Sequence, residues 1–193
     1  MSSSRGMLGQ DYFDGLYSSD PDPWGFETRE YEHRKYRNSL EALGDRRFAR
    51  ALEAGCSIGV FTEMLAPRCA ELVAVDISPH AVRRARLRMA GRDNVRVERR
   101  RLPDEMPEGP FDLIVCSEIL YYWSRPLLEA AVPALEGALA PGGTLLAVHW
   151  RLPTRTYPLQ GDEVHRILRE RLHLENVVAR THREYRLDAW RAR

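Results

Sequence analysis

Short runs suited to buried strands alternate with segments of helical periodicity along most of this 193-residue chain. Brief apolar runs bounded by turn residues are typical of strands that are buried on both faces of a parallel sheet. Because helical segments separate most of these runs, the pattern predicts a doubly wound α/β sheet. The candidate strands are residues 51–54, 72–75, 94–98, 111–116 and 144–149.

Proline and glycine set the limits of the predicted helices. Pro79 opens a helix that Gly91 ends, and Pro126 opens another, in which Pro133 predicts a kink. The turn Pro141-Gly142-Gly143 leads into the strand at 144–149. The predicted apolar faces are Ala81, Val82, Ala85 and Met89 in the first helix, and Leu127, Leu128, Ala131, Leu135, Ala138 and Leu139 in the second.

The end of the chain has a different pattern. Asp162 can cap a helix that carries Val164 and Leu168 on its apolar face. Residues 174–181 and 185–190 then look like two strands with a tight turn between them. Such a short turn can join only antiparallel strands, so we expect an antiparallel hairpin after the fifth strand.

A helical segment precedes the sheet. We expect a turn of helix at 11–17, a stiff loop at 20–25 and a helix at 26–43. We interpret residues 1–45 as a lid and residues 46–193 as the core of one single domain. Trp24 and the tyrosines of this segment lie either beside a bound ligand or in simple packing, and for Tyr36 we expect packing.

Composition and charge exclude several classes of protein. Hydrophobic residues make up 44% and charged residues 30% of the chain, which favours a globular protein over a disordered one. No apolar run reaches the length of a membrane span, and residues 1–6 lack the apolar core of a secretory signal and predict a loose tail. The net charge of +1 gives no general attraction to nucleic acid, so the arginines at 83–88 and 99–101 are expected to be solvated; a nucleic-acid patch is the alternative.

The three cysteines, Cys56, Cys69 and Cys116, have no metal-ligand spacing. An odd number of unclustered cysteines suits a reducing compartment, so we expect a cytoplasmic protein, buried thiols and no metal. Cys56 has a nucleophile as its alternative interpretation.

The most informative motif follows the first strand. Glu53, Gly55, Cys56, Ser57 and Gly59 form a glycine turn that runs into a helix. Glycine permits a sharp turn and a close approach of a ligand. Asp76 ends the second strand about 20 residues later, where an acid can bind ribose hydroxyls. This spacing resembles the E-x-G-x-x-x-G turn of class I S-adenosylmethionine-dependent methyltransferases, in which the turn packs against the methionine part of the cofactor.

That resemblance implies the fold as well as the cofactor. We expect a Rossmann-like doubly wound sheet of about seven strands with an antiparallel last strand, which binds S-adenosylmethionine and releases S-adenosylhomocysteine. Ile77 and Leu102 can offer an apolar slot for the adenine. Relatives commonly place an acid near position 101 to accept from the adenine amino group, whereas Arg101 can only donate. Either a backbone carbonyl there or Asp104 is expected to replace it.

Further candidates follow the fourth and fifth strands, since ligands bind at the carboxyl ends of strands in open α/β sheets. Ser117 and Glu118 are expected to contact the cofactor, and Tyr121 and Tyr122 to line the acceptor pocket. Glu118 and His149 are candidate bases for an amine acceptor, and His149 also a candidate acceptor contact. The alternatives are a helix-capping role for Glu118 and simple packing for His149.

The run from Phe111 to Tyr122, with Asp22-Pro23-Trp24 and Gly55-Cys56-Ser57 upstream, looks like the nodulation protein S group. These are small methyltransferases that N-methylate the free amine of a deacetylated chitooligosaccharide. The resemblance covers the chain from about residue 11 to the end. Residues 157–165, after the fifth strand, form a candidate acceptor loop, although Asp162 is more simply a helix cap.

The sequence therefore predicts a methyltransferase that acts on the nitrogen of an amino sugar or another small-molecule or oligosaccharide acceptor. O-methylation of a natural-product hydroxyl is the alternative enzyme function. A cofactor-binding protein without catalysis and a nucleic-acid methyltransferase are alternatives of other classes, and the second lacks an Asn-Pro-Pro-Tyr-type site. No nucleic-acid or membrane partner is expected, and the oligomeric state stays open.

Overall fold

The computed structural model describes residues 7–193, so the tail predicted at 1–6 lies outside the described residues. The chain divides into two compact units. The amino-terminal unit is Gly9–Met106, and the carboxy-terminal unit is Pro107–Arg193 together with residues 7–8. The boundary at 106 differs from the predicted lid boundary at 45, and the assignment of a single domain stays a prediction.

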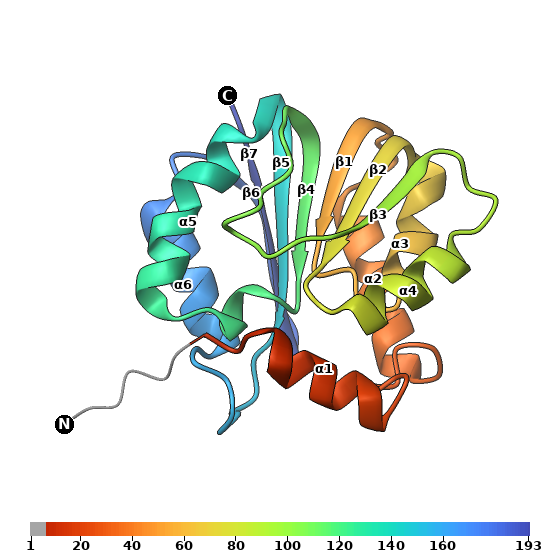
Figure 1. Cartoon of the computed structure of the whole chain (residues 1–193). Helices are drawn as coiled ribbons and strands as arrows, with labels where there is room; N and C mark the ends of the chain where they lie inside the picture. Colours follow the sequence, from red (N-terminus) through yellow and green to blue (C-terminus); the bar gives the residue numbers. More distant parts are fainter. Residues whose placement is uncertain (1–6) are drawn as a thin grey trace. The chain divides into compact units, whose positions relative to one another are not determined.

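Three parallel strands form the sheet of the amino-terminal unit, in the order β3-β2-β1. The register pairs Leu52 with Val73 and Val73 with Arg96. Apolar runs drive this arrangement in β1 and β2, whose centres are fully buried, whereas β3 is an edge strand in which only Val97 is buried. The elements of this unit, shown in Figure 1, are α1 (Gln10–Ser19), α2 (Glu30–Ala42), β1 (Phe48–Ala54), α3 (Val60–Leu65), η1 (Ala66–Arg68), β2 (Cys69–Asp76), α4 (Pro79–Arg88) and β3 (Val95–Arg99).

The helix α4 packs on this sheet through the predicted apolar face. Ala81, Val82, Ala85 and Met89 are all buried, and the last three join a cluster with residues of the turn and the strands. Pro79 stands at the first turn of α4, as expected, because it needs no N–H partner there. The helix is thereby packed against β2, β3 and the turn that follows β1.

The helix α2 differs from its prediction, because it begins at Glu30 and buries a partly polar face. Lys35 is only 1% exposed and pairs with Glu32 over 2.8 Å, and its ammonium also lies over the rings of Tyr31 and Tyr36 at 5.2 and 5.7 Å. The prediction that Tyr36 packs is confirmed, since its ring is buried and stacks on Phe61 at 4.9 Å.

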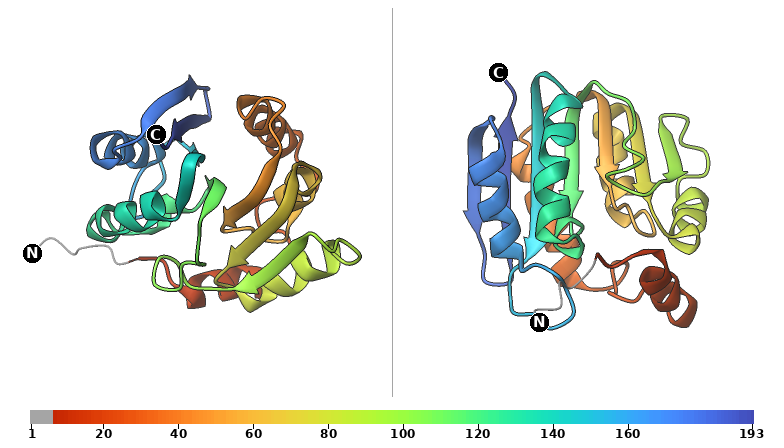
Figure 2. Two further views of the ribbon diagram at one scale, coloured as in Figure 1. Left: turned by 90° about the horizontal axis from the view of Figure 1, so that it is seen from above. Right: turned by 60° about the vertical axis from the view of Figure 1, so that its left-hand side comes forward.

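Four strands form the sheet of the carboxy-terminal unit, in the order β4-β5-β7-β6. β4 and β5 are parallel, whereas β7 is antiparallel to both of its neighbours, so the predicted hairpin is confirmed. Figure 2 shows α5 and α6 side by side over these strands. The elements are β4 (Phe111–Ser117), η2 (Leu120–Tyr122), α5 (Arg125–Gly137), β5 (Leu139–Trp150), α6 (Gly161–Arg171), β6 (Glu175–Thr181) and β7 (Tyr185–Arg191).

Two local predictions in this unit are wrong. Leu139 is not on the face of α5 but begins β5, because the backbone there already pairs with Phe111. Asp162 does not cap α6, whose N-cap is Gln160; it lies inside the first turn, where its carboxylate binds the guanidinium of Arg151 at 2.9 Å. The competing ion pair explains the second difference.

The two strand orders, β3-β2-β1 and β4-β5-β7-β6 with β7 antiparallel, are those of the predicted class I methyltransferase topology. Within residues 7–193, no helix has the length and apolar character needed to cross a membrane.

Candidate functional site

The glycine turn after β1 has the backbone geometry that the sequence suggests. Gly55, Ser57 and Gly59 have φ values of +74°, +51° and +83°, in the left-handed region that favours glycine. A Cβ on Gly59 would also lie 3.1 Å from the Ala85 backbone, so α4 packs where a side chain would be. The N–H groups of Gly55 and Cys56 both donate to the Val75 carbonyl, at 2.8 and 2.9 Å, which ties the turn to β2.

The carboxylate of Asp76 is held by this turn. Its Oδ2 accepts from the backbone N–H of Ser57 and its Oδ1 from that of Ser78, each at 2.9 Å. Burial raises the pKa of Asp76 from 3.8 to about 6, against the opposing effect of these hydrogen bonds. The structure thus places an oriented acid at the end of β2, where hydroxyl donors of a ligand would stabilise its charge.

Glu53 is the second acid of this region and the more deeply buried, with 3% exposure. Within residues 7–193, its Oε2 is buried and has no hydrogen-bond partner. Burial raises its pKa from 4.5 to about 8, opposed by the nearby Thr62 hydroxyl, and the Asp76 charge adds to the rise. A buried carboxylate with an unpartnered oxygen fits a cationic ligand group, which would offset the cost of its charge.

Side chains of α1 bind both the glycine turn and the start of α4. The Tyr17 hydroxyl lies 2.5 Å from Ser57 Oγ, and the Ser78 hydroxyl donates to Asp14 at 2.7 Å. Burial raises the pKa of Tyr17 well above 10, so this phenol is neutral. Trp24 packs edge-on against Tyr17 at 5.7 Å, which agrees with its packing interpretation; a contact with a ligand stays a prediction.

The residues predicted for the adenine slot differ in their burial. Leu102 is buried and Ile77 partly so, whereas Arg101 is exposed. The Arg101 N–H donates to the Glu105 carboxylate at 2.7 Å, and the Arg101 carbonyl accepts from the Glu105 N–H at 2.8 Å. Asp104 makes neither bond, so the acid that binds the Arg101 backbone is Glu105, which was not among the predicted site residues. Its only signal was a spacing of four residues.

All three cysteines are buried, as expected. Burial raises the pKa of the Cys56 thiol well above 9 and that of Cys116 to about 12. Both thiols stay protonated at neutral pH, which disfavours the nucleophile interpretation of Cys56, because the thiolate is the reactive form.

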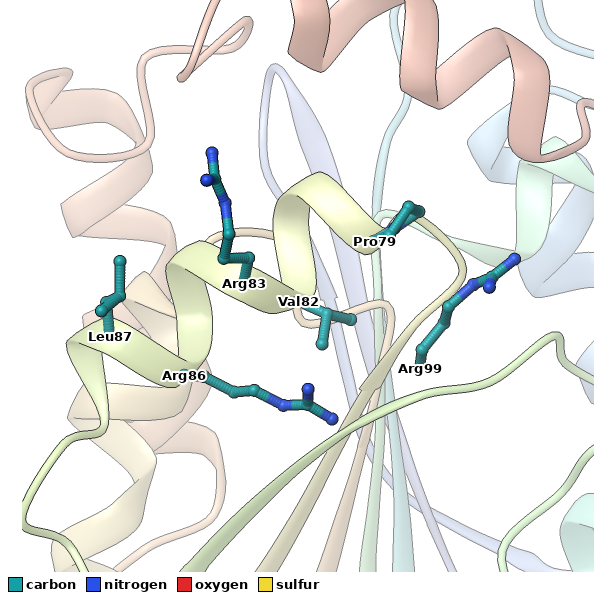
Figure 3. Close-up of a pocket in the computed structure, with 6 residues that line it drawn as sticks. All are labelled: Pro79, Val82, Arg83, Arg86, Leu87 and Arg99. Atoms are coloured by element: carbon teal, nitrogen blue, oxygen red, sulfur yellow. The ribbon is translucent and has the colours of Figure 1, made fainter.

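A surface pocket of the amino-terminal unit lies on α4 and β3, apart from the glycine turn (Figure 3). None of the predicted site residues lines it. Arg86 donates to the Val97 carbonyl at 2.9 Å and Arg99 to Gln10 at 2.5 Å, so the arginines expected to be solvated also bind neighbouring polar groups. The residues that line the pocket are Pro79, Val82, Arg83, Arg86, Leu87 and Arg99.

The candidate acceptor residues lie in the carboxy-terminal unit, with Ser117 at the end of β4 and Glu118 next to it. Glu118 has a left-handed φ of +56°, a backbone conformation that residues other than glycine rarely adopt. Its N–H donates to the Val148 carbonyl at 2.8 Å, and its Oε2 accepts from the Trp150 N–H at 2.9 Å and from the Tyr121 hydroxyl at 2.5 Å. The strained backbone therefore directs this carboxylate to the end of β5.

Tyr121 and Tyr122 belong to a three-ring cluster with Tyr157, from the loop predicted to contact the acceptor. Tyr121 stacks on Tyr157 at 4.7 Å, and Tyr122 meets both other rings edge-on at 4.6 and 4.8 Å. Burial raises the pKa values of Tyr121 and Tyr122 well above 10, so both hydroxyls are neutral. These rings can provide aromatic faces but no base.

His149 is fully buried, and both of its ring nitrogens bind within the protein. Nε2 accepts from the Leu120 N–H at 3.2 Å, and Nδ1 lies 3.1 Å from His165 Nε2. The structure places the His149 ring in a packed environment, which agrees with the alternative interpretation of this residue. No ring nitrogen is left to take a proton from an acceptor without breaking one of these bonds.

The strand order and the two acids around the glycine turn define a class I S-adenosylmethionine-dependent methyltransferase fold. A family model described as nodulation protein S (NodS) matches residues 16–151, most of the chain. The chain therefore belongs to the nodulation protein S family.

Individual relatives agree. The nodulation protein S of Bradyrhizobium diazoefficiens is 40% identical over 128 residues, which cover 65% of this chain and 61% of the relative. The chain thus spans less than two thirds of this curated relative. A crystal structure of the N-methyltransferase NodS from Bradyrhizobium japonicum with S-adenosylhomocysteine has a TM-score of 0.84 at 27% identity, covering 95% of this chain and 97% of that one. A putative methyltransferase from Pseudomonas syringae has a TM-score of 0.75 at 40% identity, covering 84% and 99%.

Proposed function

We propose that this chain is an S-adenosylmethionine-dependent methyltransferase that N-methylates the amine of an amino sugar or of another small acceptor. Membership of the nodulation protein S family supports the activity, as does the likeness to an enzyme named an N-methyltransferase. The observation that carries the proposal is the placement of Glu53 and Asp76 around one glycine turn, both buried enough to raise their pKa values.

The residues of the amino-terminal unit fit the proposed cofactor. S-adenosylmethionine, when bound, supplies a methyl group on a sulfonium centre, and it also carries ribose hydroxyls and an ammonium group. Asp76 would accept from the ribose hydroxyls, and the unpartnered Oε2 of Glu53 would accept from the ammonium. The turn at Gly55, Cys56, Ser57 and Gly59 would give close backbone approach, with Ile77, Leu102 and Trp24 as apolar contacts.

The residues of the carboxy-terminal unit suit an amine acceptor. Glu118 is the proposed base, because a carboxylate can accept the proton that an ammonium must lose before it attacks. Tyr121 and Tyr122 would provide aromatic walls for the acceptor. Ser117 keeps its proposed role as a cofactor contact, and Arg101 has no proposed role beyond its backbone contacts with Glu105.

Two measurements test this proposal. Isothermal titration with S-adenosylmethionine should show binding to one site per chain, and absence of binding would refute the cofactor assignment. Transfer of a labelled methyl group should then be compared between amino sugars, short chitooligosaccharides with one free amine, and their fully N-acetylated forms. We expect labelling of the free amines; labelling of hydroxyl-only acceptors with none of the amines would point to O-methylation instead.

We further propose that residues 1–193 act as one methyltransferase domain in the cytoplasm, with a small-molecule or oligosaccharide acceptor and no nucleic-acid or membrane partner. The net charge of +1 and the buried thiols support this reading. Labelled transfer in the presence of excess RNA or DNA tests it, since nucleic acid should neither accept label nor compete.

A further inference from the structure

A continuous chain of buried polar side chains crosses the carboxy-terminal unit behind the tyrosines. It starts at Asp188 on β7, passes His165 on α6 and ends at His149 on β5, and all three are 0% exposed. His165 Nδ1 lies 2.9 Å from Asp188 Oδ2, and His165 Nε2 lies 3.1 Å from His149 Nδ1. Each contact is within hydrogen-bond distance, so three elements distant in sequence share one network.

The hydrogen bond from Leu120 at the His149 end fixes the position of every proton in the network. The Leu120 N–H can only donate, so His149 Nε2 must be the unprotonated acceptor. His149 then carries its proton on Nδ1 and donates it to His165 Nε2. His165 in turn carries its proton on Nδ1 and donates it to the Asp188 carboxylate. Only two neutral rings in this tautomer satisfy all three contacts.

The charged groups around the network lie mainly at its Asp188 end. Asp188 Oδ2 also accepts from Arg186 Nε at 2.9 Å, and the guanidinium of Arg169 lies 3.7 Å from it. Burial lowers the pKa of His165, which the Asp188 carboxylate opposes and Arg186 reinforces, and Asp162 on the same helix adds a smaller opposing charge. Desolvation thus favours the neutral form of the His165 ring.

The network ends on the segment that carries the proposed acceptor residues. Leu120 is the first residue of η2, which continues through Tyr121 and Tyr122. The end of β5 therefore holds this segment through three hydrogen bonds. His149 accepts from the Leu120 N–H, the Trp150 N–H donates to the Glu118 carboxylate, and the Glu118 N–H donates to the Val148 carbonyl. The ring of Tyr121 also lies 5.2 Å from that of His149.

From this geometry we infer that His149, His165 and Asp188 are positioning residues that hold the Glu118–Tyr122 segment in place for the acceptor. None of the three touches the acceptor or the cofactor in this scheme. Their hydrogen bonds fix the orientation of the His149 ring, and that ring fixes η2. The inference rests on the proposed function, because it assigns these residues to the acceptor side of the same reaction.

The tautomers can be tested without cofactor or acceptor. Two-bond 1H–15N correlation spectra of the labelled whole chain at pH 7 should show His149 and His165 as neutral rings with the proton on Nδ1. The two rings are assigned by comparison with His149→Gln and His165→Gln. A ring protonated on Nε2, or doubly protonated at pH 7, would overturn the inference even if the methyltransferase proposal holds.

Kinetics test the positioning role. His165→Leu removes the acceptor for the His149 proton, whereas His165→Gln can supply a carbonyl oxygen there. With a short chitooligosaccharide carrying one free amine, we expect kcat/KM for the acceptor to fall about tenfold or more in His165→Leu and to recover in part in His165→Gln. The dissociation constant for S-adenosylmethionine should stay within about twofold of wild type, because the network contacts neither Ser117 nor the glycine turn, Glu53 and Asp76, to which cofactor binding is assigned.

Ile167→Val is the matched control, since it trims a side chain on the same helix that is 1% exposed and purely apolar. It should leave the acceptor kcat/KM unchanged. Equal losses in Ile167→Val and His165→Leu, or a folded His165→Leu with wild-type kinetics, would contradict the positioning role. If His165→Leu does not fold, the ring tautomers still decide the question. Absence of methyl transfer in the wild type would instead count against the proposed function.

Discussion

Ser57 donates its backbone N–H to Asp76 Oδ2 over 2.9 Å, although the two residues are 19 positions apart in the sequence. Ser57 can do so because its φ of +51° turns the N–H toward β2. Since the same residue meets the Tyr17 hydroxyl through its side chain, the turn, the acid and α1 form one connected group. A change at any one of the three should therefore alter cofactor affinity.

Replacement of Asp76 by alanine should weaken S-adenosylmethionine binding. Hydrogen bonds to a charged group contribute about 1.5 to 3 kcal/mol each, so the dissociation constant should rise roughly 10- to 100-fold. Isothermal titration measures the change. Asp93→Ala removes an exposed carboxylate of the same unit and should bind as wild type; equal affinities for all three proteins would rule out the ribose role of Asp76.

Glu53 should make the cofactor-free protein less stable as the pH rises. Its pKa is raised from 4.5 to about 8, so the folded protein binds more protons than the unfolded one between these values. The unfolding free energy therefore falls across this window, by about 2 to 5 kcal/mol for a shift of this size. Urea denaturation between pH 4.5 and 8.5 follows it directly.

The isosteric change Glu53→Gln should remove the fall in stability between pH 6 and 8 and leave only the smaller contribution of Asp76 below about pH 6. It should also raise the stability at pH 8, because a neutral amide replaces a buried charge. Glu184→Gln, between β6 and β7, should keep the wild-type slope. The same change at Glu53 should also weaken cofactor binding, since a neutral amide carries no negative charge to balance the positive charge of the cofactor ammonium. A wild-type slope in Glu53→Gln would show that another group causes the pH dependence.

Glu118→Gln tests the base. If Glu118 takes the proton of the acceptor, kcat should fall about 100-fold or more, in line with typical losses of a general base. Single-turnover rates with saturating cofactor and a free-amine acceptor measure this step. Tyr121→Phe keeps the carboxylate and removes one of its hydrogen bonds, so it should lose much less. A wild-type single-turnover rate in Glu118→Gln, with cofactor and acceptor saturating, would show that Glu118 is not the base and only contacts the cofactor or supports the fold.

Gly161→Ala should destabilise the carboxy-terminal unit. A Cβ at this position would lie 2.1 Å from the Trp150 carbonyl oxygen and 3.2 Å from His149 Cβ, so α6 would have to move away from β5. Overpacking of this kind costs about 1 to 3 kcal/mol, measurable by thermal denaturation. Gly15→Ala, in α1 with no atom within 4 Å of the added Cβ, should be neutral or slightly stabilising.

Local signals in the sequence were enough for the sheet and for half of the site. The apolar runs predicted the parallel strands, and the short turn before Tyr185 predicted the antiparallel hairpin, because both depend on neighbouring residues only. The spacing from Glu53 to Asp76 likewise predicted two acids on successive strand ends. The predicted roles of these residues toward a cofactor stay predictions.

The remainder depended on contacts between distant residues. Asp162 has the composition of a helix cap, but the guanidinium of Arg151 competes for it. His149 looked like a candidate base at a strand end, and its burial follows from His165 and Asp188, which no sequence spacing connects to it. A charged Asp188 in the apolar run Leu187–Trp190 was the one local sign of a buried polar partner.

Lys35 is the single lysine of the chain, and its ammonium is enclosed by Glu32 and two tyrosine rings. An endoprotease that cleaves after lysine therefore has one site in the whole sequence, and that site is accessible only when α2 opens. The rate of this single cut reports the opening of α2 without any introduced label. Comparing that rate with and without S-adenosylmethionine would measure how strongly the ligand stabilises the amino-terminal helices.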